Sequence, residues 1–147
     1  MDLPFVPPDF DVPTHFVGPG FHLEPLDAHH NPRDYEAWTT SMDHITATPG
    51  FENWGWPHPM SLEENLADLV GHAADFKNRI GFTYSILDGE AIIGCVYIYP
   101  SSTHAASVRS WVRASRADMD RAVWQSLSDW LATEWPFASI DYATRDR

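Results

Sequence analysis

The longest regular pattern of apolar and polar positions in this chain lies between Phe82 and Trp135. Apolar and polar residues alternate over residues 82–87, and the Asp88-Gly89 pair that follows favours a tight turn. The return segment, residues 92–99, is apolar at nearly every position, as in a strand that is covered on both faces. The pattern therefore predicts a β-hairpin, in which Gly94 marks a bulge or a close approach of two backbones.

The hairpin is followed by a predicted strand, a helix and a second strand. Residues 108–114 form the first strand, and residues 140–143 form the last one. Between them, residues 117–135 predict an amphipathic helix that Pro136 ends. The apolar face of this helix carries Val123, Leu127, Trp130 and Leu131. A strand-helix-strand connection implies a parallel pair, so the predicted sheet is mixed.

Two further helices are predicted in the first half of the chain. Asn31 or Asp34 can cap a helix that continues to Ile45, with apolar residues three and four positions apart. A second helix starts at Ser61, because Glu64 three residues later completes a capping box. Its expected buried stripe consists of Leu62, Leu66, Leu69, Val70 and Ala73.

Residues 1–20 predict an extended, proline-rich arm, because five prolines remove backbone donors and fix φ. Phe5, Phe10 and Phe16 are expected to fasten this arm to the domain or to a neighbouring subunit. Residues 21–26 then alternate as an edge strand does. The rest of the chain, residues 21–147, is predicted to be a single domain.

Composition and charge restrict the class of protein. With 147 residues, 44% of them hydrophobic, the chain is typical of a globular domain. Its formal net charge of −12 disfavours nucleic acid as a partner, and no apolar run is long enough to cross a membrane. The single cysteine, Cys95, excludes an intramolecular disulfide. The acidic, proline-rich N-terminus is unlike a secretory signal, so a cytoplasmic location is expected.

The predicted order is strand, helix, helix, hairpin, strand, helix, strand, with WVRAS before the last helix. This order resembles the GNAT superfamily of acyl-CoA-dependent N-acyltransferases over about residues 21–143, and looks like a short bacterial subgroup with phrases such as MSLEENLADL and IGCVYIYP. The resemblance implies an α/β (α+β) fold with a mixed, mostly antiparallel sheet flanked by helices. The family continues with a helix and a hairpin where this chain stops at Arg147. The edge left open is expected to be covered by the arm or by a second subunit, and a homodimer is therefore predicted.

The resemblance also implies where an acyl-CoA co-substrate would bind. In the family a splayed strand offers backbone groups to the pantetheine arm, and a Q/R-x-x-G-x-G/A turn directs helix amides at the pyrophosphate. Counted from the strand end, the motif falls on residues 117–122, where only the final small residue fits. Ser115 and Asp118 are spaced as a capping box that would occupy the anion site. The residues expected to contact the cofactor are Trp111, Val112, Arg113, Arg116, Met119 and Arg121.

The loop from Phe51 to Met60 corresponds to the part of the family fold that covers the acceptor pocket. It carries Trp54, Trp56 and His58, and aromatic walls surrounded by acidic residues suit a small cationic or aromatic amine. The alternative interpretation is a lid that packs on the core. The histidines share no flanking pattern and His29-His30 lacks a partner four residues away, so no metal site is predicted.

The resemblance, together with the departure from the family's phosphate motif, implies two possible functions. The first is a GNAT-type N-acyltransferase that moves an acyl group from acetyl-CoA or another acyl-CoA to a small amine. The alternative is a non-catalytic GNAT-like binding or interaction protein whose phosphate site is closed by Ser115 and Asp118. His104, Tyr97 and Tyr99 are candidates for proton transfer, but the sequence does not identify a catalytic residue.

Overall fold

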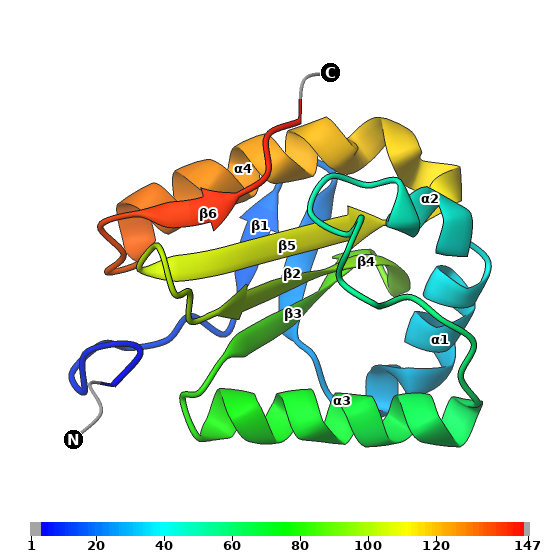
Figure 1. The fold of residues 1–147 in the computed structure, drawn as a ribbon, viewed down its shortest axis with the longest axis horizontal. Coiled ribbons are helices and arrows are strands. Elements are labelled where there is room, and N and C mark those ends of the chain that lie inside the picture. The colour runs from blue at the N-terminus through cyan, green and yellow to red at the C-terminus, as the bar shows by residue number, and fades with distance from the viewer. Residues whose placement is uncertain (1–3, 146–147) are drawn as a thin grey trace.

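One six-stranded sheet runs through the molecule, and each strand pairs with the next one in sequence (Figure 1). The computed structural model describes residues 4–145. Neighbouring strands are antiparallel from β1 to β5, and β6 lies parallel to β5. The predicted mixed, mostly antiparallel sheet is therefore confirmed. The strands are β1 (Phe16–Gly18), β2 (Phe21–Pro25), β3 (Phe82–Asp88), β4 (Ala91–Tyr99), β5 (Ala106–Val112) and β6 (Ile140–Tyr142).

Helices cover both faces of the sheet, with α3 and α4 at opposite sides in Figure 1. Core residues on one face pack with α4 and the N-terminal arm, and those on the other face pack with α1 and α3. None of the helices within residues 4–145 combines the length and the apolarity needed to cross a membrane. The helices are α1 (Asn31–Thr39), α2 (Met42–Thr46), α3 (Leu62–Lys77) and α4 (Asp120–Glu134), with short 3-10 helices η1 (Ala28–His30) and η2 (Ala114–Met119).

The β3–β4 hairpin is confirmed, and so are both expectations for Gly94. Gly89 adopts a φ of +61° in the tight turn, where glycine carries no Cβ penalty. The register of the hairpin shifts between Ile86 and Leu87, opposite Gly94 and Ile92. A Cβ atom on Gly94 would lie 2.1 Å from the Trp111 carbonyl oxygen. The absent side chain therefore allows β4 and β5 to approach closely.

The N-terminal arm contributes an edge strand to the sheet. β1 lies within it and pairs with β2, so the prediction that residues 21–26 form the edge was wrong. The three arm phenylalanines fasten it to the domain, as expected. The ring centroids of Phe5 and Phe82 are 5.9 Å apart, those of Phe10 and Trp135 5.3 Å, and those of Phe16 and Trp130 4.8 Å.

The first predicted helix consists of two helices, because the chain turns at Thr40 and Ser41. The Thr40 hydroxyl donates to the Glu36 carbonyl, and the Ser41 hydroxyl oxygen accepts from the backbone N–H of Ala114. Neither predicted cap is found: His30 precedes α1, and the Asn31 side chain donates to the Leu62 carbonyl instead.

The capping box at the start of α3 is confirmed, but its buried stripe is not the predicted one. Glu64 N–H donates to the Ser61 hydroxyl at 3.1 Å, and Ser61 N–H donates to the Glu64 carboxylate at 2.8 Å. Leu69 is 3% exposed, whereas the other two leucines and the valine of the predicted stripe are between 40% and 52% exposed. These exposed residues are Leu62, Leu66 and Val70.

The rotation of α3 follows from a buried polar network around Asn65. Its side chain accepts from Trp38 Nε1 at 3.0 Å and donates to Asn31 at 2.7 Å and to Asp34 at 3.0 Å. Buried polar groups need hydrogen-bond partners, and these partners all lie on α1. Asn65 therefore turns towards α1, and the next residue, Leu66, turns outwards.

Candidate functional site

The turn between β5 and α4, where the family holds a pyrophosphate, is not closed in the way the sequence suggested. No side chain caps η2 or α4, and the chain makes a 3-10 turn with a kink at Arg116. The predicted capping box of Ser115 and Asp118 was therefore wrong. The turn is held instead by the Ser41 hydroxyl, which accepts from Ala114 N–H, and by Arg116 N–H, which donates to the Arg113 carbonyl.

The residues predicted to contact a cofactor do not form one cluster. Trp111 and Val112 are buried on opposite faces of the sheet. Arg113 pairs with Glu36 at 2.7 Å, and Arg116 pairs with Asp88 at 3.0 Å and lies against the sulfur of Met119. Arg121 is exposed. Their role in cofactor binding stays a prediction.

The gap between β5 and β6 is filled by side chains of the C-terminal segment. The two strands pair only as far as Val108 and Tyr142. Beyond this point the Tyr142 hydroxyl bonds to the Ser110 hydroxyl at 2.5 Å, and Arg145 Nη2 donates to the Ser110 carbonyl at 2.7 Å. Arg145 also pairs with Asp120 at 2.7 Å. A pantetheine arm on the path implied by the family would have to displace Arg145.

A second candidate site lies on the other side of β5, between α1, α3 and the loop before α3. It consists of an inner cavity of about 250 Å³ and an outer cavity of about 390 Å³, which share Trp54, His72 and Tyr97. Of the three residues predicted for the acceptor pocket, Trp54 and Trp56 line the inner cavity. His58 is exposed and its ring points to the Pro59 carbonyl, so the structure does not place it there.

Aromatic rings form the walls of this pocket. The Trp54 ring lies 5.2 Å from Tyr97 and 6.0 Å from Trp56, between ring centroids. Trp56 packs in turn against Trp38 at 5.3 Å and Trp111 at 6.0 Å. The loop thus packs on the core and also lines a cavity, so the two interpretations of its aromatic residues are compatible.

Asp34 is the most deeply buried ionisable side chain of the inner cavity, with 4% of its surface exposed. Its Oδ2 accepts from Asn65 at 3.0 Å, and within residues 4–145 its Oδ1 has no hydrogen-bond partner and the carboxylate has no cationic partner. Burial raises the pKa of Asp34 from 3.8 to about 6, and the nearby Asp68 adds to this effect. An unpaired buried carboxylate at the side of an aromatic cavity suits a cationic group.

His72 lies between the inner and outer cavities and is held in one tautomer. The Tyr99 hydroxyl donates its proton to Asp75 at 2.9 Å, so it accepts from the His72 Nδ1–H, 2.9 Å away, and the Thr83 hydroxyl oxygen lies 3.2 Å from the same Nδ1. The Nε2 atom is then unprotonated, and no hydrogen bond to it is found within the described part of the chain. Burial lowers the pKa of His72 even though Asp68 and Asp75 oppose the effect. A neutral imidazole with a free Nε2 can accept a proton.

The outer cavity carries a guanidinium group. Arg109 Nε donates to the Gly50 carbonyl at 2.9 Å, and the guanidinium carbon lies 4.9 Å from the centre of the Trp54 ring. Asp75, Tyr99 and Ser107 also line this cavity. The two cavities together therefore contain charges of both signs.

Asp34, His72 and Arg109 were not predicted as site residues from the sequence. A local signal existed for part of this set: Asp68, His72 and Asp75 are spaced four and three residues apart, which places them on one face of a helix. We assigned the inner face of α3 to its leucines, so this polar face was not recognised. Nothing local marks Asp34 as buried.

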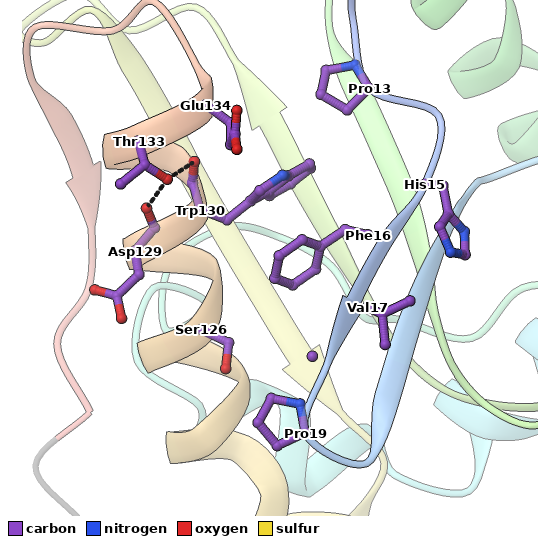
Figure 2. Close-up of a pocket in the computed structure, with 11 residues that line it drawn as sticks. Pro13, His15, Phe16, Val17, Pro19, Ser126, Asp129, Trp130, Thr133 and Glu134 are labelled. Carbon is purple, nitrogen blue, oxygen red and sulfur yellow. Dashed lines mark hydrogen bonds between the residues drawn. The ribbon is translucent and has the colours of Figure 1, made fainter.

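A larger cavity, of about 620 Å³, lies between β1 and α4 (Figure 2). Phe16 and Trp130 form its apolar part, and the Thr133 hydroxyl is bonded to backbone carbonyls of its own helix. None of the polar side chains that line it is buried, in contrast to Asp34. The smaller pocket at Asp34 is therefore the better candidate for chemistry.

One group of residues within positions 4–145 has the composition of a metal site. Glu24, His29 and His30 each offer one ligand atom, and these three atoms lie within 4.8 Å of one another. Both ring nitrogens of His30 are engaged, because Nδ1 accepts from Asp27 N–H at 3.2 Å and Nε2 donates to Glu24 at 3.2 Å. This arrangement is complete as a hydrogen-bond network. The predicted absence of a metal stays a prediction.

Solved structures of acetyltransferases share this fold. RimL, a ribosomal alpha-N-protein acetyltransferase, matches with a TM-score of 0.62 and 16% identity over 80% of this chain and 63% of its own. RimJ of Mycobacterium smegmatis, in complex with a CoA-disulfide, matches with a TM-score of 0.63 and 15% identity over 86% of this chain and 63% of its own. MccE, the microcin C7 self-immunity acetyltransferase, in complex with acetyl-CoA and AMP, matches with a TM-score of 0.58 and 13% identity over 77% of this chain and 61% of its own. This chain thus spans less than two thirds of each of these structures. No protein-family model and no curated protein matches it.

Proposed function

Because the chain has the fold of the GNAT acetyltransferases, we propose that it is an N-acyltransferase that moves an acyl group from an acyl-CoA to a small amine. The single observation that carries this proposal is the unpaired, buried carboxylate of Asp34 in an aromatic cavity beside a free His72 Nε2. The CoA and acetyl-CoA found in the RimJ and MccE structures support acyl-CoA as the co-substrate.

The amine enters as an ammonium ion and pairs with Asp34. The rings of Trp54 and Tyr97 line the cavity and attract the cation through their π faces. Because the pKa of Asp34 is about 6, this carboxyl group is ionised at neutral pH and can hold the cation.

His72 then prepares the amine for attack. Its Nε2 takes one proton from the ammonium group, while Nδ1–H stays hydrogen-bonded to the Tyr99 oxygen. The amine nitrogen forms a bond to the thioester carbonyl carbon and loses its second proton as the carbon–sulfur bond breaks, and the CoA thiolate takes up that proton and leaves as the thiol. His72 returns its extra proton to solvent through the outer cavity.

The phosphates of CoA are assigned to the turn after β5. Arg113 and Arg116 stand at this turn and would exchange Glu36 and Asp88 for phosphate oxygens. The pantetheine arm would take the place of Arg145 beside Ser110. A homodimer and a cytoplasmic location also stay predictions, and sedimentation velocity of the purified protein tests the first.

The test is release of free thiol from acetyl-CoA in the presence of a panel of small primary amines. We expect turnover, with His72→Gln lowering kcat about 100-fold or more while KM for the amine changes little. Asp34→Asn should instead raise KM for the amine about tenfold. His29→Gln is the matched control, because this histidine is exposed and lines neither cavity, and the kinetics of this variant should equal those of the unchanged protein. Full activity of His72→Gln, or no thiol release with any amine, contradicts the proposal.

One observation favours the alternative, a non-catalytic binding protein. Arg145 occupies the gap in which pantetheine would lie, and both arginines at the turn are already paired. Calorimetric titration with acetyl-CoA separates the two functions. Saturable binding that Arg113→Ala combined with Arg116→Ala abolishes supports the enzyme, and no binding at millimolar cofactor supports the alternative.

A further inference from the structure

The two ends of the aromatic pocket differ in charge. Asp34 and Asp68 line the inner cavity, and no cationic side chain lines it. The outer cavity contains Arg109, whose Nη1 and Nη2 atoms have no hydrogen-bond partner within residues 4–145. Asp75 also lines the outer cavity, but its Oδ2 already accepts the Tyr99 hydroxyl proton.

Arg109 is held in a fixed orientation with its outer edge free. Its Nε donates to the Gly50 carbonyl, and its flat face lies over the Trp54 ring. A guanidinium held through Nε and one face presents its two terminal amino groups as a planar pair of donors. A carboxylate accepts such a pair through two parallel hydrogen bonds, which a neutral amide cannot do.

We propose that the acceptor is a small amino acid-like molecule, which carries an amine at one end and a carboxylate at the other. The amine is held by Asp34 in the inner cavity, and the carboxylate is held by Arg109 in the outer cavity. The body between the two groups is apolar or aromatic, because Trp54 and Tyr97 line both cavities. This inference rests on the proposed function only in assigning the amine to the same pocket.

The dimensions of the pocket agree with a molecule of this size. The inner and outer cavities, of about 250 and 390 Å³, are each within or close to the range of small-molecule sites. A protein N-terminus would also present an amine, but it carries no carboxylate at a fixed distance unless its sequence supplies one. Arg109 therefore distinguishes a free small molecule from a general polypeptide end.

The experiment compares 4-(aminomethyl)benzoate with 4-(aminomethyl)benzamide by calorimetry, without CoA. The unchanged protein should bind the acid about tenfold more tightly than the amide, since a charged, bidentate hydrogen-bonded pair is lost in the amide. Arg109→Gln should remove this preference by weakening the acid alone. Asp34→Asn should weaken both compounds by similar factors. A series from 4-aminobutyrate to 6-aminohexanoate then identifies the preferred separation of the two groups.

If the Arg109→Gln variant folds poorly, Arg109→Lys takes its place in the same binding experiment. Lysine retains the charge but lacks the planar pair of donors. The preference of this variant for the acid should therefore lie between that of the unchanged protein and that of Arg109→Gln. Equal affinity of the unchanged protein for acid and amide overturns the inference, as does an equal loss for both compounds in Arg109→Gln.

Failure of this inference and failure of the proposed function have different signatures. Acyl transfer to the amide as efficient as to the acid leaves the enzyme in place and removes the role of Arg109. If the acid binds with the expected dependence on Arg109 but no thiol is released from acetyl-CoA, the proposed acyltransferase activity is contradicted and the proposed class of ligand is supported.

Discussion

At the scale of single residues, burial keeps two side chains of the pocket in useful protonation states. His72 is neutral because desolvation disfavours its cation, and its free Nε2 can accept a proton. Asp34 is ionised at neutral pH but lies far closer to protonation than an exposed aspartate, with a pKa of about 6. A buried charge without a partner destabilises the free protein, as is common at functional sites.

The unfavourable burial of the Asp34 carboxylate predicts that the difference in stability between the unchanged protein and Asp34→Asn depends on pH. The unfolded chain releases the Asp34 proton near pH 3.8 and the folded chain near pH 6, so the folded state binds more protons between these values. This term therefore makes folding less favourable as pH rises through that window, by about 3 kcal/mol in all. Asp34→Asn, which can still accept from Asn65, should be about equally stable at pH 4 and more stable than the unchanged protein at pH 7.

Urea unfolding of the unchanged protein and of Asp34→Asn between pH 4 and pH 7 measures the difference in their free energies of unfolding. Contributions from the other titrating groups cancel in this difference. A stability gap that does not change with pH contradicts the assignment of a raised pKa to Asp34.

At the scale of elements, α3 shows how a helix with a correct start can have the wrong face predicted. The capping box of Ser61 and Glu64 is local, and it was predicted from a spacing of three residues. The rotation of the helix depends on Asn65, whose partners on α1 lie 27 to 34 residues away in sequence. No local pattern favours an asparagine over a leucine for the inner face.

This rotation predicts unequal effects for two leucines of the same helix. Leu69→Ala should cost about 2 kcal/mol, at the lower end for a buried leucine because the side chain borders a cavity. Leu66→Ala, on the exposed side, should change stability by about 0.5 kcal/mol or less. Urea unfolding midpoints of the two variants provide the comparison, and a larger loss for Leu66→Ala would restore the predicted leucine stripe.

At the scale of the whole molecule, one arginine joins the end of the described chain to the middle of the sheet. Arg145 donates to the Ser110 carbonyl and pairs with Asp120, 35 and 25 residues earlier. It thereby connects the segment after β6 to β5 and to the first turn of α4. The same contacts fill the gap that the family fold uses for pantetheine.

Arg145→Met should therefore destabilise the protein by about 1–3 kcal/mol, because Asp120 is left partly buried without its partner. Arg121→Met is the control, since this arginine is exposed and pairs with no acid within the described residues, and its unfolding midpoint should stay unchanged. Thermal unfolding measures both. If Arg145→Met is as stable as the control, the arginine does not hold this segment.

The same variant tests the path of the co-substrate. Removal of Arg145 frees the Ser110 carbonyl, so CoA affinity should rise if the pantetheine arm lies there.

By itself the sequence determined those features that neighbouring residues control. The alternation of residues 82–99, the Asp88-Gly89 turn and the capping box at Ser61 each depend on positions a few residues apart, and all three are confirmed. The order of these elements predicted the mixed sheet, and its resemblance to the GNAT superfamily implied the fold that the acetyltransferase structures share. Trp54 and Trp56 of the aromatic loop line a cavity, and their role in binding an acceptor stays a prediction.

Only the tertiary structure decided the chemistry of the site. Asp34 is an ordinary helix aspartate until α3 and β4 bury it, and Arg109 meets Gly50 and Trp54 only after the loop folds over β5. The capping-box spacing of Ser115 and Asp118 suggested a closed anion site, but the turn is held by Ser41, which lies 73 residues from its partner Ala114. Burial and long-range hydrogen bonds set protonation and orientation, and both depend on contacts between segments that no local spacing encodes.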